Sequence, residues 1–112
     1  MDINGDLAEK VSIMAREPIH PGEFLRDELE EIQISATQLS REIGVPPNRI
    51  SQILRGKRDI SADTALRLGK FFGTGPDLWM NLQYSYDLDK ARAVLGPDLS
   101  NIQRWRPAAR AG

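Results

Sequence analysis

Residues 35–60 read SATQLSREIGVPPNRISQILRGKRDI, and this stretch decides the fold. Ser35 suits the cap that starts a helix, and the glutamine three residues later completes a capping box. Gly44 follows the last apolar position of that helix, where a glycine can adopt the left-handed conformation that ends a helix and turns the chain. Pro46 and Pro47 lack a backbone donor and are tolerated where a helix begins. The stretch therefore predicts two short helices joined by a tight turn.

The second of these helices, residues 47–55, is predicted to have one buried and one polar face. Ile50, Ile53 and Leu54 follow the i, i+3, i+4 spacing of an amphipathic helix. The side chains left facing outward are polar or basic: Asn48, Arg49, Ser51, Gln52 and Arg55. This pattern is typical of a helix-turn-helix whose second helix enters the DNA major groove.

The composition of the 112 residues excludes several classes of function. The chain has no cysteine and a single histidine, His20 between two prolines, which we interpret as a structural turn residue. No nucleophile–base pair, phosphate-binding glycine loop or metal-ligand cluster is visible, so we expect no catalytic, cofactor or metal site. No apolar run approaches the ~18 residues of a membrane span, and the first seventeen residues do not resemble a secretory signal. We therefore expect a soluble cytoplasmic protein.

The net charge of −1 hides an uneven distribution along the chain. Residues 1–34 carry nine acidic and three basic side chains, whereas residues 35–72 carry seven basic and three acidic ones. The basic segment coincides with the predicted helix-turn-helix. The acidic segment is expected to repel DNA, and it is either a surface for a basic partner or simply a solvated helix face.

The segments on either side are predicted to be helical. Residues 1–17 have no clear period, and we expect a flexible N-terminal arm. A helix is predicted from residue 21 or 22 to residue 32. Its expected apolar face consists of Phe24, Leu25, Leu29 and Ile32. Ser61 suits the cap of the next helix, with Gly73 at its end. The expected buried face of that helix consists of Ala65, Leu66, Leu68, Phe71 and Phe72.

A fifth helix is predicted to open at Gly75–Pro76, and Gly96–Pro97 is expected to break its pattern and leave 97–112 as a loosely ordered tail. Four large apolar side chains lie along one side of this helix: Leu78, Trp79, Leu82 and Tyr86. They exceed the needs of a small core, so we interpret them either as core or as a candidate dimer interface.

Three segments in the same order resemble motifs of the HigA/VapI-type antitoxins of the Xre-like helix-turn-helix family. They are PIHPGEFL at 18–25, GKRDISADTALRL at 56–68, and FGTGPDLWMNLQ at 72–83 followed by YDL at 86–88. The resemblance implies an all-α, five-helix, lambda-repressor-like domain over 18–92, with an N-terminal arm at 1–17 and a C-terminal tail at 93–112. It also implies a homodimer that neutralises a HigB-like, RelE-like ribonuclease toxin and represses its own operon.

Two positions depart from the family pattern. The usual small alanine of the first motif helix is Ser40 here, and its hydroxyl needs a hydrogen-bond partner. Pro46–Pro47 stands where repressors often carry a serine cap and a polar base reader. This departure shifts the expected base contacts along the second helix.

With these departures, the resemblance and the outward face together suggest specific DNA contacts on a palindromic operator. The residues expected to read bases are Asn48, Arg49, Ser51 and Gln52. Those expected to contact phosphates are Thr37, Gln38, Arg55, Lys57 and Arg58. Two alternatives remain open: a stand-alone helix-turn-helix regulator, and a toxin-binding module with little DNA binding.

Overall fold

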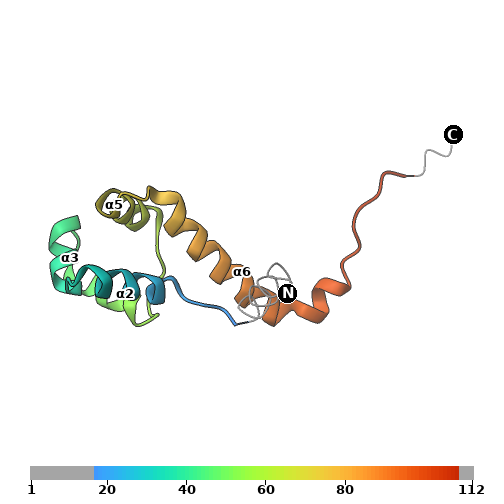
Figure 1. Cartoon of the computed structure of the whole chain (residues 1–112). Helices are drawn as coiled ribbons and strands as arrows, with labels where there is room; N and C mark the ends of the chain where they lie inside the picture. Colours follow the sequence, from blue (N-terminus) through green and yellow to red (C-terminus); the bar gives the residue numbers. More distant parts are fainter. Residues whose placement is uncertain (1–16, 109–112) are drawn as a thin grey trace, which may run out of the picture.

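A computed structural model describes residues 17–108 of the chain, and within them the regular secondary structure is entirely helical (Figure 1). The helices are α2 (Pro21–Ile32), α3 (Ala36–Ile43), α4 (Pro47–Leu54), α5 (Ala62–Phe72) and α6 (Pro76–Ser100). The all-α class is confirmed. Apart from Glu17, the predicted N-terminal arm lies outside the described residues.

The helix ends follow the local signals in the sequence. The Ser35 Oγ accepts a hydrogen bond from the Gln38 amide at 3.0 Å, and the Ser61 Oγ accepts one from the Thr64 amide at 3.3 Å. At the start of α2, the His20 Nδ1 accepts a hydrogen bond from the Gly22 amide at 2.9 Å. These bonds satisfy amides that have no partner within the helix. The prediction that His20 is a structural turn residue is therefore confirmed.

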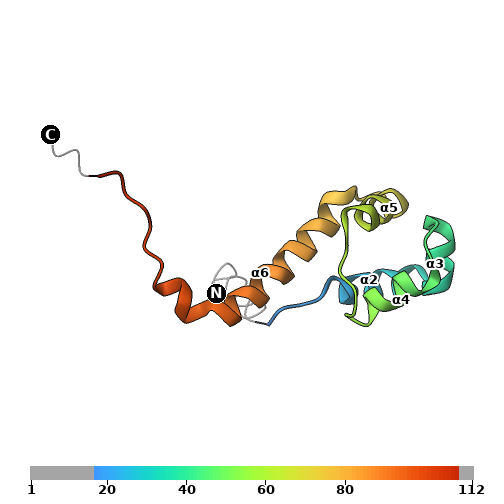
Figure 2. The same cartoon turned by 180° about the vertical axis from the view of Figure 1, so that it is seen from behind.

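The helices form one hydrophobic core with the α3–α4 pair at one end. Figures 1 and 2 show α3 and α4 beside α2, with α5 leading into the long α6. Helix α2 packs against α4, and α5 packs against α3 and α6. The buried apolar residues are Leu25, Leu29, Leu39, Ile43, Val45, Ile50, Ile53, Ile60, Ala65, Leu68 and Trp79. Since most helices contribute, none of the short ones depends on its own propensity alone.

The predicted buried faces of α2 and α5 need correction at their large residues. Ile32, Leu66 and Phe71 are exposed, and Leu66 keeps 59% of its surface accessible. Helix α5 instead buries a stripe that includes small side chains: Thr64, Ala65, Leu68 and Gly69. Small residues allow the α5 backbone to approach its neighbours closely, so this face turns inward and carries Leu66 outward.

The expected break of the fifth helix at Gly96–Pro97 is wrong, because α6 continues to Ser100. Proline removes one backbone donor, which is costly in a buried helix interior. Here every residue from 90 to 100 is exposed, so the carbonyl that loses its partner can bind water. The helix ends where the amides of Asn101 and Ile102 bond back to Asp98 and Leu99. The C-terminal half of α6 projects away from the other helices (Figure 2).

Candidate nucleic-acid interface

The turn between α3 and α4 is fixed by backbone geometry and by one side chain. Gly44 has φ 72°, a left-handed conformation that favours glycine. The next amide, that of Val45, donates to the Ser40 carbonyl at 2.9 Å, and the Val45 side chain is buried in the corner. The Ser40 hydroxyl donates to the Ala36 carbonyl at 2.8 Å, so this departure from the family pattern is satisfied within α3.

Helix α4 is anchored firmly enough to present a defined outer face. Ile50 and Ile53 have no accessible surface and hold the inner side of α4 in the core. At its C-terminal end, the Leu54 carbonyl accepts a hydrogen bond from the Arg26 Nη2 of α2 at 2.7 Å. A cation at the C-terminus of a helix also interacts favourably with the helix dipole.

The four residues expected to read bases lie on the outer side of α4. Asn48 is exposed, whereas Arg49, Ser51 and Gln52 are half-buried. The Arg49 Nη1 donates to Asp63 Oδ1 at 2.9 Å, and the Gln52 Oε1 accepts from the Arg58 Nε at 2.9 Å. The side chains of Arg49 and Gln52 are therefore oriented by neighbours in the free protein.

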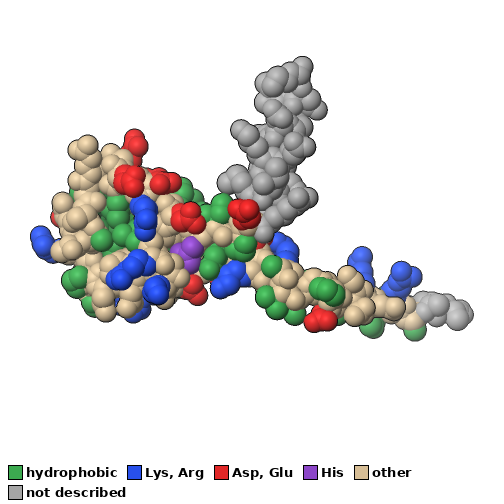
Figure 3. Space-filling model, turned by 90° about the horizontal axis from the view of Figure 1, so that it is seen from below, with side chains coloured by type: hydrophobic (Ala, Val, Ile, Leu, Met, Phe, Trp, Pro, Cys, Tyr) green, Lys and Arg blue, Asp and Glu red, His purple; other side chains and the backbone are tan. Residues whose placement is uncertain are grey.

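The residues expected to bind phosphates lie at two edges of this surface. Arg55, Lys57 and Arg58 are exposed where α4 gives way to the next loop, and Thr37 and Gln38 are exposed at the start of α3. The Gln38 amide is already bonded to Ser35, so only the Gln38 side chain remains for a ligand. On the face shown in Figure 3, Lys and Arg side chains gather on the compact part of the molecule, and acidic ones lie mainly along its upper edge.

Two charged side chains on α5 that contact this surface, Asp63 and Arg67, were missed by sequence reasoning. Asp63 receives Arg49 from α4 and also the Arg67 Nε at 2.8 Å. The Arg67 Nη1 donates to the Ile43 carbonyl at 2.7 Å, at the end of α3. Hydrogen bonds from Arg67, and secondarily from Arg49, hold the pKa of the Asp63 carboxyl below its usual range. The i, i+4 spacing of Asp63 and Arg67 was the sequence signal that could have indicated this ion pair.

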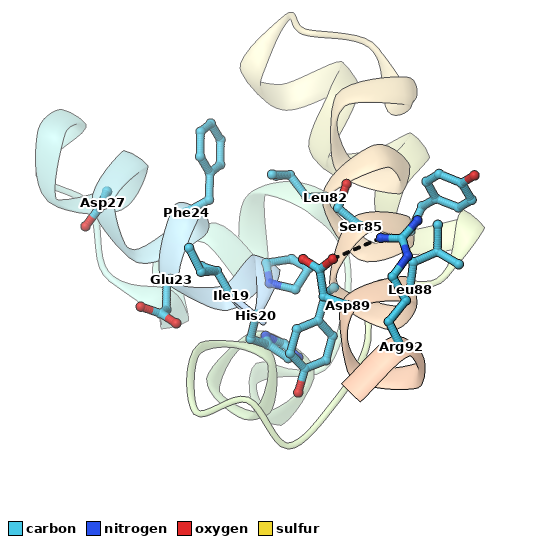
Figure 4. Close-up of a pocket in the computed structure, with 13 residues that line it drawn as sticks. Ile19, His20, Glu23, Phe24, Asp27, Leu82, Ser85, Leu88, Asp89 and Arg92 are labelled. Carbon is cyan, nitrogen blue, oxygen red and sulfur yellow. Dashed lines mark hydrogen bonds and ion pairs between the residues drawn. The ribbon is translucent and has the colours of Figure 1, made fainter. Parts of the chain in front are cut away.

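A second surface lies between the start of α2 and the middle of α6. It is a groove of about 810 Å³. Its apolar lining includes Ile19, Phe24, Leu82 and Leu88. Figure 4 shows the Leu82 side chain extending from α6 toward Phe24 of α2. Acidic residues Glu23, Asp27 and Asp89 also line it.

The four residues of the candidate dimer interface differ in how deeply they are buried. Trp79 has no accessible surface and stacks near Phe24 and Phe72 in the core, so its assignment to a dimer interface is wrong. Leu78, Leu82 and Tyr86 are only partly buried. The Trp79 Nε1 donates a hydrogen bond to the Thr74 hydroxyl at 3.1 Å, in the loop that precedes α6. Its one polar group is therefore satisfied inside the core.

The fold and the outer face of α4 define a helix-turn-helix protein of the DNA-binding class. Between residues 17 and 108, no three side chains of metal-ligating type are grouped closely enough to hold an ion. In the same part of the chain, no helix has the length and apolar character needed to cross a bilayer.

The comparison with known proteins identifies the family. The helix-turn-helix family model HTH_3 matches residues 25–79. Virulence-associated protein I of Dichelobacter nodosus is 49% identical over 74 residues, covering 65% of this chain and 68% of that protein. The chain belongs to the Xre-like helix-turn-helix family of HigA/VapI-type antitoxins, which are DNA-binding regulators and not enzymes.

Solved structures agree with this assignment over the folded region. The chain is similar to an addiction-module antidote protein of the HigA family from Coxiella burnetii, at 47% identity and TM-score 0.76, covering 79% of this chain and 98% of that one. It is also similar to the Pseudomonas aeruginosa antitoxin HigA solved with the higBA promoter, at 44% identity and TM-score 0.76, covering 80% and 100%.

Proposed function

We propose that this chain is the antitoxin of a toxin–antitoxin module and represses its own operon by sequence-specific DNA binding. The observation that carries the proposal is the outward face of α4, where Arg49 and Gln52 stand beside exposed cations on a rigid helix. The structure of the Pseudomonas aeruginosa antitoxin HigA with the higBA promoter supports the same class of ligand.

The chemistry of each residue suits a separate part of that task. Arginine pairs bidentately with guanine and glutamine with adenine in the major groove, which are the roles of Arg49 and Gln52. Asn48 and Ser51 complete the base-reading face. Arg55, Lys57 and Arg58 bind phosphates, which contribute affinity and salt dependence without reading sequence.

The second part of the proposal is a homodimer on a palindromic operator. Two copies of α4 enter successive major grooves roughly 34 Å apart, as paired half-sites require. A stripe of apolar side chains on α6 leads from the groove along the projecting half of the helix. We assign the dimer contact to this stripe, which consists of Tyr84, Leu88, Ala91, Leu95 and Leu99. These positions follow a helical spacing of three or four residues, as expected of a packed face.

Leu95→Glu is expected to convert the dimer into a monomer, because a carboxylate on an apolar contact loses its water without gaining a partner. Sedimentation equilibrium measures the change. Val94→Glu is the matched control, since Val94 is 79% exposed and points off the stripe. A wild-type monomer, or equal behaviour of the two variants, contradicts the α6 contact.

The third part is neutralisation of a HigB-like, RelE-like ribonuclease toxin. The exposed side of α2 is acidic, with Glu23, Asp27, Glu30 and Glu31, and it suits a basic protein partner. A growth assay in which this protein is co-expressed with a HigB-like toxin tests this role. Growth restored by co-expression supports it, and continued toxicity despite folded protein contradicts it.

The DNA-binding role is tested by titrating the full chain on its own upstream region, with unrelated DNA as competitor and at two salt concentrations. Competitor-resistant binding that weakens as salt rises is expected. If binding is specific only when the toxin is added, the toxin is a co-repressor. Absence of specific binding in both cases favours the alternative of a toxin-binding module with little DNA binding.

A further inference from the structure

Asp63 connects α4 to the turn that precedes α4. Its Oδ1 accepts hydrogen bonds from the Arg49 Nη1 of α4 at 2.9 Å and from the Arg67 Nε at 2.8 Å. Arg67 in turn donates to the carbonyls of Ile43 and Gly44, at 2.7 and 3.4 Å. One carboxylate on α5 therefore joins Arg49 to the end of α3.

The hydrogen bonds among Asp63, Arg49 and Arg67 contribute little to the stability of the fold. The side chains of Asp63 and Arg67 are 56% and 41% exposed, and ion pairs in contact with water contribute little to the free energy of unfolding. Asp63 is ionised at neutral pH, and the two guanidinium groups lower its pKa further below the usual range. The network is better suited to controlling where the Arg49 side chain points.

Orientation matters for an arginine because phosphate and guanine compete for it. A freely rotating arginine side chain loses rotamer entropy when it is fixed, and phosphates attract it on DNA of any sequence. With Nη1 held by Asp63, the Nε and Nη2 edge of Arg49 keeps the fork geometry that matches guanine O6 and N7. The Asp63 charge also repels phosphates, which penalises complexes without the base contact.

We propose that Asp63 is a positioning residue that sets the sequence specificity of DNA binding by orienting Arg49 toward a base. The inference rests on the proposed function, in which Arg49 reads the operator. It adds an acidic residue on α5, outside the helix-turn-helix, to the determinants of specificity.

The test measures the dissociation constants of wild type, Asp63→Asn, Arg49→Ala and the double variant. Each is titrated by fluorescence anisotropy on the operator and on unrelated DNA of equal length at one salt concentration. Asp63→Asn is expected to lower the ratio of specific to non-specific affinity about tenfold, the scale of one base contact, while unrelated DNA binds equally or more tightly. In the Arg49→Ala background, Asp63→Asn is expected to leave the ratio unchanged.

Asp77→Asn is the matched control. Asp77 is exposed in the first turn of α6, as Asp63 is in the first turn of α5, so both variants remove one charge at a helix N-terminus. If Asp63→Asn and Asp77→Asn change the ratio of specific to non-specific affinity equally, the effect of Asp63→Asn is only that of removing a charge, and the inference is overturned. An unchanged ratio in Asp63→Asn, with a specific wild type, overturns the Asp63 role alone. A wild type without specificity overturns sequence-specific repression and this inference with it.

Discussion

Replacement of both Arg49 and Gln52 by alanine is expected to abolish specific operator binding and to leave the fold intact. Each bidentate base contact contributes about 1–3 kcal/mol of discrimination, and the proposed dimer makes every contact twice. Operator affinity is therefore expected to fall about 100-fold or more toward the non-specific level. Anisotropy titrations on operator and unrelated DNA measure the loss.

The fold is expected to remain intact because the side chains of Arg49 and Gln52 are not part of the hydrophobic core. Arg49 and Gln52 contact exposed partners, and Asp63 keeps Arg67 after Arg49 is removed. The free energy of unfolding is expected to change by less than about 1 kcal/mol. Lys57→Ala is the comparison variant: it should weaken binding to all sequences alike and lower the salt slope by about 2, roughly 1 for each subunit of the proposed dimer. Operator affinity that is unchanged in the double variant would show that these two residues do not read bases.

Gly22→Ala is expected to destabilise the protein by about 3 kcal/mol, a large share of the ~5–15 kcal/mol that holds a small domain together. A Cβ on Gly22 would overlap the carbonyl oxygen of Ile53 and would lie 2.9 Å from the carbonyl carbon. Both atoms belong to the backbone of α4, so no side-chain rotation relieves the overlap. Helix α2 must move away from α4, and urea unfolding measures the resulting loss of stability.

Gly96→Ala makes the same substitution in α6, where a Cβ meets no atom within 4 Å. Alanine is the better helix former, so this variant is expected to gain about 0.5–1 kcal/mol. Gly22→Ala is expected to lower the free energy of unfolding and Gly96→Ala to raise it. This difference in sign distinguishes the steric overlap at Gly22 from the general effect of alanine on helix propensity. If Gly22→Ala is as stable as wild type, the close contact between α2 and α4 is not formed.

Much of the interface could be predicted from the sequence because its signals are short in range. Ser35, Gly44 and Pro47 act on amides and carbonyls within four residues, so the limits of α3 and α4 followed from local patterns. The outward position of Asn48 followed from helix periodicity alone. The orientation of Arg49 did not, because its partner Asp63 lies 14 residues away on another helix.

The same distinction explains the errors. Trp79 belongs to the core and not to a free surface because Phe24 and Phe72 converge on it from two other parts of the chain. Leu66 is exposed because α5 turns its small residues inward. The continuation of α6 through Pro97 depended on solvent access at that point of the folded chain, which periodicity does not report.

The sequence by itself determined where each helix begins and where α2 to α5 end, which face of α4 is polar, and the family to which the chain belongs. Those features rest on bonds between near neighbours and on motifs that survive in the linear order of residues. Only the tertiary structure decided which apolar side chains are buried, how Asp63 joins Arg49 to the turn, and why Gly22 tolerates no side chain. The physical reason is that each of these depends on atoms brought together by packing from distant parts of the chain.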